Sequence, residues 1–404
     1  MGCSPGPAAR LEAVLDPVIP RLGELLRRRP GSLSLAQGMV DWAPPPAVLQ
    51  AVRDALEAPG ASLHRYGATW GEPELLDAVA HKLTRANGLD LEGSLLLATT
   101  GSNLAFAALA QVICDPGSEV ILPLPAYFNH GMAVQLAGGV PVGVEAGPIP
   151  DPAVLAAALT PRSRAIVTIS PNNPSGVVIP EAVLRAINQL CADRGLLHIS
   201  DEAYELFVHG MEPHFSPGSL SGAAAHTASL YSFSKAHGMA GWRMGYAAVP
   251  ELLRPALAKV LDTLQIAPTA ISQRAAAAAL ATDPSWALER LKSLAPRRAQ
   301  LLAAVERWQN EGLPVRLWAE PDGAFYGLLV VEGSGTTADQ ALDSDGLMEW
   351  LVLEEGVATV SGRAFGLHLP GAWVLRVSFG MLQGPALAEA LERLGRGLRR
   401  LLRR

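Results

Sequence analysis

The most informative stretch of the chain is the segment Ser232-Phe-Ser-Lys-Ala-His-Gly-Met-Ala-Gly-Trp-Arg243, which follows an apolar strand candidate. Two serines precede Lys235, and Arg243 follows it eight residues later. Lysine is rarely buried, yet a desolvated amine with a lowered pKa is the nucleophile that a Schiff base requires. The hydroxyls of Ser232 and Ser234, together with Arg243, can clamp a dianionic phosphate. The segment therefore predicts a Schiff-base lysine beside an anion site, the alternative being a surface loop with an exposed lysine.

Outward from this segment, apolar runs alternate with helical stretches from about residue 47 to residue 281. The strand candidates are Ser94–Thr99, Glu119–Leu122, Ala165–Ser170, Leu196–Ser200, Ser229–Ser232 and Met244–Val249. The helices between them include Leu104–Ile113, Asn129–Leu136 and Glu181–Asp193. Near-continuous apolar strands separated by helices are typical of a parallel, doubly wound α/β sheet. Such a fold gathers its ligands at the carboxyl ends of the strands.

The two flanks of this region predict a second, smaller α+β domain. Residues 10–29 read as one amphipathic helix that ends at Arg29-Pro30-Gly31. A long helical region over 284–311 leads into short strands and a final helix, the strands being Leu313–Pro321, Ala324–Val330 and Trp373–Ser378. We expect an N-terminal arm and helix at 1–46 that packs with the small domain, a large domain at 47–283 and the small domain at 284–404.

Composition narrows the class of protein. The 404 residues are 49% hydrophobic and 17% charged, with a net charge of −6 that argues against a nucleic-acid partner. No apolar run approaches the ~18 residues that a membrane helix needs, so we expect no membrane partner. Cys3, Cys114 and Cys191 show neither metal-ligand nor CxxC spacing. We therefore expect no metal site and a cytoplasmic location.

Three further polar motifs follow strand candidates. Ser170-Pro-Asn-Asn-Pro-Ser-Gly176 is a rigid turn that can hold a ligand or serve only as a turn. In Ser200-Asp-Glu-Ala-Tyr204, Asp201 can keep a pyridine nitrogen protonated and Tyr204 can bond the phenolic oxygen of the ring, unless the loop is simply solvated. Thr99-Thr-Gly-Ser-Asn103 joins a strand to a helix start, where free backbone N–H groups attract anions.

A late strand candidate carries one cation. Arg376 stands alone in the apolar run Val374-Leu-Arg-Val-Ser-Phe379. A buried arginine usually needs a carboxylate partner. The sequence leaves open whether that partner is a protein side chain or a substrate.

Taken together, these motifs resemble the class I/II aminotransferases, which depend on pyridoxal phosphate (PLP) and have the aspartate aminotransferase fold, fold type I. Asn-Pro-Ser-Gly, Asp-x-x-Tyr, Ser-x-Ser-Lys with its later arginine, and Arg-Val-Ser occur in the family's order from about Leu33 to the C-terminus. The resemblance implies a large domain with a mostly parallel seven-stranded sheet plus a smaller α+β domain. It also implies a homodimer with shared active sites.

The resemblance implies a role for each matching position. Lys235 matches the lysine that forms the Schiff base and carries the proton, and Asp201 matches the partner of the pyridine nitrogen. Tyr204 and Asn173 match the groups on the ring oxygen. The positions that match the phosphate binders are Gly101, Ser102, Asn103, Ser232, Ser234 and Arg243.

Other matching positions surround the ring and the substrate. Tyr127 matches the aromatic residue that stacks on the ring, and Tyr66 matches a tyrosine that reaches the phosphate across the dimer interface. Gly38 and Arg376, assisted by Asn173, match the binders of the substrate α-carboxylate. The family also leads us to expect a cis bond at Asn173–Pro174.

Within the family, the chain is most similar to plant- and cyanobacterial-type aromatic/methionine aminotransferases, on the phrases Ala36–Pro46, Pro125–Asn129, Ser232–Tyr246 and Leu375–Gly380. This subgroup implies an aromatic amino acid or methionine as donor and a 2-oxo acid as acceptor. Trp42 can line an apolar side-chain pocket or simply pack, and the sequence shows no obvious second arginine for a distal carboxylate.

Several alternatives stay open on the same scaffold. They are an alanine, aspartate or branched-chain donor, a kynurenine or cysteine-conjugate transaminase, and a β-lyase. A cofactor-binding transcription regulator is disfavoured, because only about 30 residues precede the core and they contain no basic helix-turn-helix module.

Overall fold

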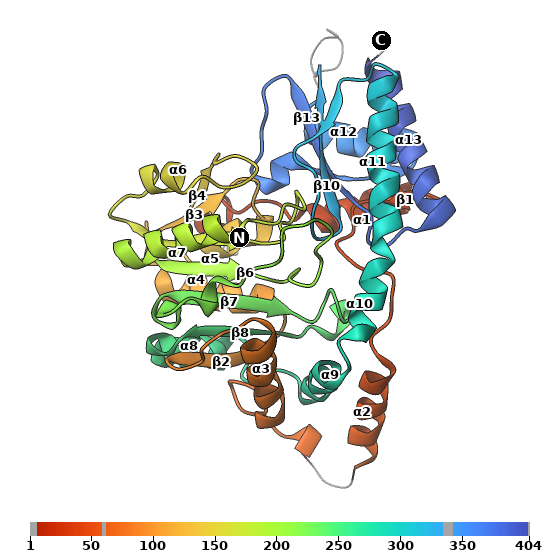
Figure 1. Ribbon diagram of the computed structural model, residues 1–404. Coiled ribbons are helices and arrows are strands. Elements are labelled where there is room, and N and C mark those ends of the chain that lie inside the picture. Colours follow the sequence, from red (N-terminus) through yellow and green to blue (C-terminus); the bar gives the residue numbers. More distant parts are fainter. Residues whose placement is uncertain (1–5, 59–61, 334–341, 403–404) are drawn as a thin grey trace, which may run out of the picture.

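The computed structural model describes residues 6–58, 62–333 and 342–402, so Cys3 lies outside the described residues. A seven-stranded sheet forms the centre of the larger half of the molecule (Figure 1). Its order is β2-β8-β7-β6-β5-β3-β4, and every pairing is parallel except those of β8 with β2 and β7. The strands are β2 (Ser94–Thr99), β3 (Glu119–Pro123), β4 (Val140–Val144), β5 (Ser163–Ile169), β6 (Leu197–Asp201), β7 (Thr227–Ser232) and β8 (Gly245–Pro250). The predicted α/β fold with a mostly parallel seven-stranded sheet is confirmed.

The edge strand β4 has no counterpart among the strand candidates. Its sequence, Val140-Pro-Val-Gly-Val144, contains two residues that weaken strands, and most of it is exposed or half-exposed. Proline is tolerated on an edge strand because one side of such a strand has no neighbour to bond. The alternation of apolar residues is therefore too weak there to mark a strand.

Helices cover both faces of this sheet. Alternate strand residues such as Leu95 and Leu97 pack against one helical layer, and Ala98 and Tyr246 face the other way. The first layer contains α4 (Ser102–Ile113), α5 (Phe128–Leu136) and α8 (Arg254–Leu264). The second contains α3 (Pro73–Ala86), α9 (Ala270–Ala281) and α7 (Glu181–Arg194). Helix on sheet on helix is the layering of a doubly wound fold.

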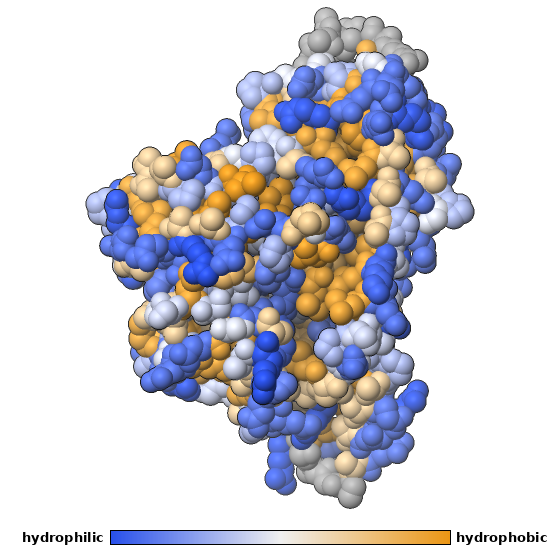
Figure 2. Space-filling model, in the orientation of Figure 1, coloured by the Kyte–Doolittle hydropathy of each residue, from blue (hydrophilic) through white to orange (hydrophobic). Residues whose placement is uncertain are grey.

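A smaller antiparallel sheet has the order β12-β13-β10-β9. Its strands are β9 (Val315–Leu317), β10 (Tyr326–Glu332), β12 (Val360–Ser361) and β13 (Ala372–Ser378). The helices α1 (Val18–Arg28), α10 (Ser285–Lys292), α11 (Leu294–Asn310), α12 (Ser344–Trp350) and α13 (Gly384–Leu402) complete this half. In Figure 2, hydrophilic residues cover much of the visible face, and hydrophobic residues gather beside α10 and the adjoining end of α11.

Two predicted single helices are each divided in two. Residues 10–29 form a short 3-10 turn, Ala9–Leu11, and then α1, because Pro17 caps the second helix and cannot continue a first one. The region 284–311 divides at Ser293 into α10 and α11. Pro296 has no N–H for the carbonyl of Lys292, so the helical hydrogen-bond ladder is interrupted there.

The N-terminal arm packs with the smaller sheet. β1 (Leu33–Ser34) pairs in parallel with β11 (Val357–Ala358), and the N–H of Ser378 donates to the carbonyl of Leu35 at 2.7 Å. Leu22 and Leu25 of α1 join the core of this half. The exact domain boundaries at 46/47 and 283/284 stay predictions. Within the described ranges, no helix is both long and apolar enough to cross a membrane.

Candidate active site

A pocket of about 540 Å³ opens where β5, β6 and β7 end and α4 begins. It brings together residues from distant parts of the chain, as expected for the carboxyl ends of strands in a doubly wound sheet. The lining residues are Ser102, Asn103, Tyr127, Ile169, Asn173, Asp201, Ala203, Tyr204, Ser232, Ser234, Lys235 and Arg243. All of them except Ile169 and Ala203 are predicted site residues.

Lys235 projects into this pocket from the loop that follows β7. Its Nζ donates a hydrogen bond to the carbonyl of Gly38 at 2.7 Å and lies 5.7 Å from the centre of the Tyr204 ring. The pKa of the Lys235 amine is lowered from 10.5 to about 8. Burial is the largest cause, the positive charges of Arg376 and Arg243 act in the same direction, and Asp201 opposes them. Far more of this amine is thus neutral and nucleophilic near neutral pH than of an exposed lysine.

Asp201 ends β6 and is nearly fully buried, with 6% of its surface exposed. Its Oδ2 lies 3.2 Å from Nε2 of His130, and its Oδ1 accepts the N–H of Ala203 at 3.1 Å. These two contacts satisfy the polar atoms of the buried carboxyl group and hold it at the pocket wall. An aspartate carboxylate at this place has the charge that a protonated pyridine nitrogen would require.

His130 is a site residue that the sequence reasoning missed. It lies on α5, one helical turn after Tyr127, is 2% exposed and stacks on Phe106 with ring centres 4.0 Å apart. Its spacing from Tyr127 is the only sequence signal, because it stands in no strand-end motif. The imidazole orients Asp201 from behind, and its Nδ1 is buried without a hydrogen-bond partner in the described structure.

The start of α4 forms an anion cradle with Arg243. Gly101 caps the helix with a φ of 81°, and no side chain bonds the free N–H groups of the first turn. A Cβ at position 101 would collide with Nη2 of Arg243. Arg243 itself donates to the carbonyl of Ala240 at 3.0 Å and lies 3.4 Å from Oγ of Ser234. Helix N–H groups, hydroxyls and a guanidinium converge as a phosphate dianion requires.

Arg376 lies in β13 with 2% of its surface exposed. Its Nη1 donates to Oδ1 of Asn173 at 2.9 Å, and its Nη2 donates to the carbonyl of Ala36. In the part of the chain that the structure describes, no Asp or Glu side chain pairs with Arg376, and its Nε has no partner. The structure thus offers no protein carboxylate for this buried cation, so the guanidinium is available to a ligand carboxylate.

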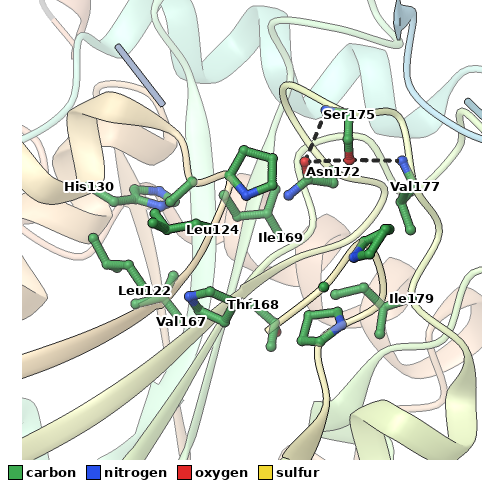
Figure 3. A pocket seen from close by; sticks show the side chains of 16 residues that line it. Leu122, Leu124, His130, Val167, Thr168, Ile169, Asn172, Ser175, Val177 and Ile179 are labelled. Atoms are coloured by element: carbon green, nitrogen blue, oxygen red, sulfur yellow. Dashed lines mark hydrogen bonds between the residues drawn. The ribbon is translucent and has the colours of Figure 1, made fainter. Parts of the chain in front are cut away.

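The turn that carries Asn173 is held by its own side chains. Oδ1 of Asn172 accepts the N–H and the hydroxyl of Ser175, at 3.0 and 2.8 Å (Figure 3). Ile169 also borders the separate, largely apolar hollow drawn there, which His130 helps to line. The expected cis bond at Asn173–Pro174 is wrong, since the cis bond of this turn is Ser170–Pro171. Any X-Pro amide permits both isomers, so the motif alone does not select the proline.

The remaining predicted residues differ in how they reach the pocket. The Tyr127 hydroxyl hydrogen-bonds Asn103, and burial raises the pKa of Tyr127. Tyr66 is 86% exposed and does not line the pocket of its own chain. Trp42 packs on Phe207 with ring centres 6.5 Å apart and donates from Nε1 to the carbonyl of Ala236 at 3.1 Å.

Comparison with known proteins agrees with this geometry. The family model for aminotransferase class I and II matches residues 30–394. The chain is 34% identical to aromatic aminotransferase ISS1 of Arabidopsis thaliana, over 96% of this chain and 94% of that protein. It is 36% identical to the aspartate/prephenate aminotransferase of Thermus thermophilus, over 93% and 94%. The crystal structure of aromatic aminotransferase from Pyrococcus horikoshii superposes with a TM-score of 0.81 at 31% identity, covering 94% of this chain and 99% of that one.

Fold and site together define a PLP-dependent enzyme of fold type I. The chain belongs to the class I and II aminotransferases and is a transaminase that acts on amino acids and 2-oxo acids. Its cofactor is pyridoxal phosphate, and the residues present fit that group. A lysine with a lowered pKa, a buried carboxylate and an anion cradle meet at one pocket.

Proposed function

We propose that this aminotransferase transfers the amino group of an aromatic amino acid or methionine to a 2-oxo acid. The observation that carries the proposal is the apolar surrounding of Arg376. Its guanidinium carbon lies 4.6 Å from the centre of the Tyr326 ring and 5.1 Å from that of Phe365. Such a cation can bind an α-carboxylate amid apolar side chains, and apolar surroundings favour an apolar donor side chain.

Apolar side chains continue beyond Phe365. Phe128 lies 5.5 Å from Phe365, ring centre to ring centre, and borders a hollow that is also lined by Leu15, Val18, Met132 and Met348. The two arginines that line this hollow are already paired with acids. They are Arg21 with Glu349, and Arg363 with Asp343 and Asp345. A second substrate carboxylate would have to displace one of these acids, whereas an apolar side chain would not.

We further propose the following division of labour. Lys235 holds the cofactor and then carries the proton at the substrate Cα. Asp201, which His130 contacts, would hold the pyridine nitrogen protonated, and Tyr204 and Asn173 would bind the ring oxygen. PLP, when bound, supplies the electron-withdrawing ring. Tyr127 would cover the ring. The residues that would bind the phosphate are Gly101, Ser102, Asn103, Ser232, Ser234 and Arg243.

At the substrate end, Arg376 fixes the α-carboxylate together with Asn173 and the backbone at Gly38. This contact orients the Cα–H bond toward Lys235. The orientation contributes strongly to the reaction rate, because a misplaced Cα–H bond loses its proton slowly. Tyr66 serves the phosphate of a partner subunit in a homodimer. Its exposure in the single chain suits that role, and light scattering of the purified protein tests the dimer.

A donor panel tests the substrate proposal. Steady-state rates with phenylalanine, tyrosine, tryptophan, methionine, alanine, leucine and aspartate are measured against 2-oxoglutarate and pyruvate. We expect kcat/KM at least about tenfold higher for the preferred aromatic donor or methionine than for aspartate, about 1.4 kcal/mol of discrimination. A preference for aspartate would contradict the proposal and favour the activity for which the Thermus relative is named.

A second assay of the purified protein tests the alternative β-lyase activity. Incubation with a cysteine conjugate and no 2-oxo acid yields catalytic pyruvate and ammonia only if a Cβ leaving group is eliminated. We expect at most one turnover per active site under these conditions.

A further inference from the structure

The hydroxyls of Tyr204 and Tyr326 form a hydrogen bond of 2.8 Å between the two halves of the molecule. Tyr204 follows β6 of the large sheet, and Tyr326 begins β10 of the small one. Both side chains are buried, Tyr326 completely. A hydrogen bond between two buried groups is strengthened by the low local dielectric, so its direction has consequences for whatever Tyr204 contacts.

Tyr326 also lies close to Arg376 and to Gly38. Its ring lies under the guanidinium of Arg376, and a Cβ at Gly38 would lie 2.5 Å from its hydroxyl oxygen. The carbonyl of the same glycine accepts the hydrogen bond from Lys235. Tyr326 therefore occupies the space between the carboxylate-binding cation and the cofactor-binding lysine, and only the lack of a side chain at position 38 makes room for it.

The position of the two hydroxyls indicates which of them donates the shared bond. Each hydroxyl has one hydrogen to donate and can also accept one. Tyr204 lines the active-site pocket, whereas Tyr326 is not among its lining residues. If Tyr204 gives its hydrogen to an acceptor in the pocket, Tyr326 must therefore supply the hydrogen of the shared bond. Burial raises the pKa of both hydroxyls, so both keep their hydrogens.

We propose that Tyr326 is a positioning residue that donates to the hydroxyl of Tyr204 and thereby directs the Tyr204 hydrogen toward the phenolic oxygen of PLP. The inference rests on the role proposed above for Tyr204. Cooperative polarisation makes Tyr204 a stronger donor. A stronger donor stabilises the phenolate, which lowers the pKa of the Schiff base between PLP and Lys235, because the phenolate then depends less on the protonated imine.

The test is a pH titration of the Schiff-base absorbance band in the holoenzyme. Tyr326→Phe removes only the hydroxyl and keeps the ring beneath Arg376. We expect its Schiff-base pKa to rise by roughly half to one unit, the size of one modest hydrogen bond. The affinity for 3-phenylpropionate, a carboxylate without an amino group, should change less than about twofold, because Arg376 keeps its aromatic neighbour.

Two further variants make the result specific. In Tyr204→Phe the Schiff-base pKa should rise more, and the Tyr204→Phe/Tyr326→Phe double variant should show no further rise, because Tyr326 acts only through Tyr204. Tyr246→Phe, which removes the hydroxyl of a buried tyrosine stacked on Tyr231 instead, should leave the pKa unchanged. An unchanged pKa in Tyr326→Phe, or additive shifts in the double variant, would overturn the proposal. If the wild-type holoenzyme showed no Schiff-base absorbance band at any pH, the proposed role of Lys235 itself would be wrong.

Discussion

Arg297 and Asp41 form a two-point ion pair that joins the N-terminal arm to α11. Nη2 of Arg297 lies 2.9 Å from both carboxylate oxygens of Asp41, and Nη1 donates to the carbonyl of Gly380 at 2.7 Å. Arg297 is 4% exposed. The pair anchors a stretch of the arm whose carbonyls, at Ala36 and Gly38, accept hydrogen bonds from Arg376 and Lys235.

Asp41→Asn should therefore weaken both folding and donor binding. An arginine left buried without its acid costs about 3 kcal/mol, and the loosened arm releases the carbonyl that holds Arg376. We expect a lower unfolding midpoint in calorimetry and a donor KM several-fold higher, with a smaller change in kcat. Glu251→Gln, which removes an exposed pair with Arg254, is the control and should leave both unchanged.

Lys235→Ala should abolish the Schiff-base absorbance and turnover together. The variant keeps the anion cradle of Arg243, so PLP can still bind without a covalent link. Dialysis then distinguishes bound from lost cofactor. Retained transamination by Lys235→Ala would refute the assignment of this lysine.

The rate at which the cofactor-free protein takes up PLP should depend on pH through the Lys235 amine. Only the neutral amine attacks an aldehyde, so the rate should rise with pH and level off above about 8, the lowered pKa of this side chain. Arg376→Gln removes a positive charge that lowers this pKa. Its rate profile should therefore shift to higher pH in stopped-flow measurements, and a shift to lower pH would contradict this electrostatic picture.

Arg376→Gln should also lower kcat/KM for an amino acid donor by roughly 100-fold or more, the worth of a charge-assisted, two-point contact. Phenylethylamine, which is phenylalanine without its carboxylate, supplies the control. If the guanidinium binds the α-carboxylate, the variant and the wild-type protein should differ little with this amine. An equal loss for both donors would assign Arg376 a structural role.

Gly101→Ala should weaken PLP binding at least about tenfold by equilibrium dialysis. The new Cβ would meet the guanidinium of Arg243, and the φ of 81° disfavours any side chain. Gly241→Ala lies in the same region of the fold with open space around its Cβ and serves as the matched control. Equal affinities in the two variants would contradict the cradle.

Much of the site could be predicted because its residues follow apolar strands. Asp201 ends β6, and Lys235 follows β7 closely, so the sheet topology alone brings them together. His130 and Tyr326 could not be predicted in this way. His130 faces Asp201 from a helix, and Tyr326 reaches Tyr204 from the other sheet, so both depend on packing between elements that no local pattern encodes. The order of the motifs along the chain indicated the family, and the roles followed from it position by position.

The helix boundaries show the opposite case. A local signal, a proline, was present in the sequence, but the apolar periodicity around it predicted one continuous helix. Pro17 and Pro296 both stand inside runs whose apolar spacing suits one continuous helix, and the helix is interrupted near each of them. A proline removes a backbone donor whatever the pattern around it. The sequence pattern missed the edge strand β4 for a different reason, because a half-exposed strand shows little alternation of apolar residues.

The stretch from Leu33 to Trp42 contacts Arg376, Lys235, the strand β11 and the loop after β7, although it precedes every strand of the large sheet in the chain. Engineers who wish to change the donor would therefore gain little from altering strand-end loops alone. The arm and those loops form one pocket wall, and libraries that vary the two jointly should yield altered donor preferences that neither region produces by itself.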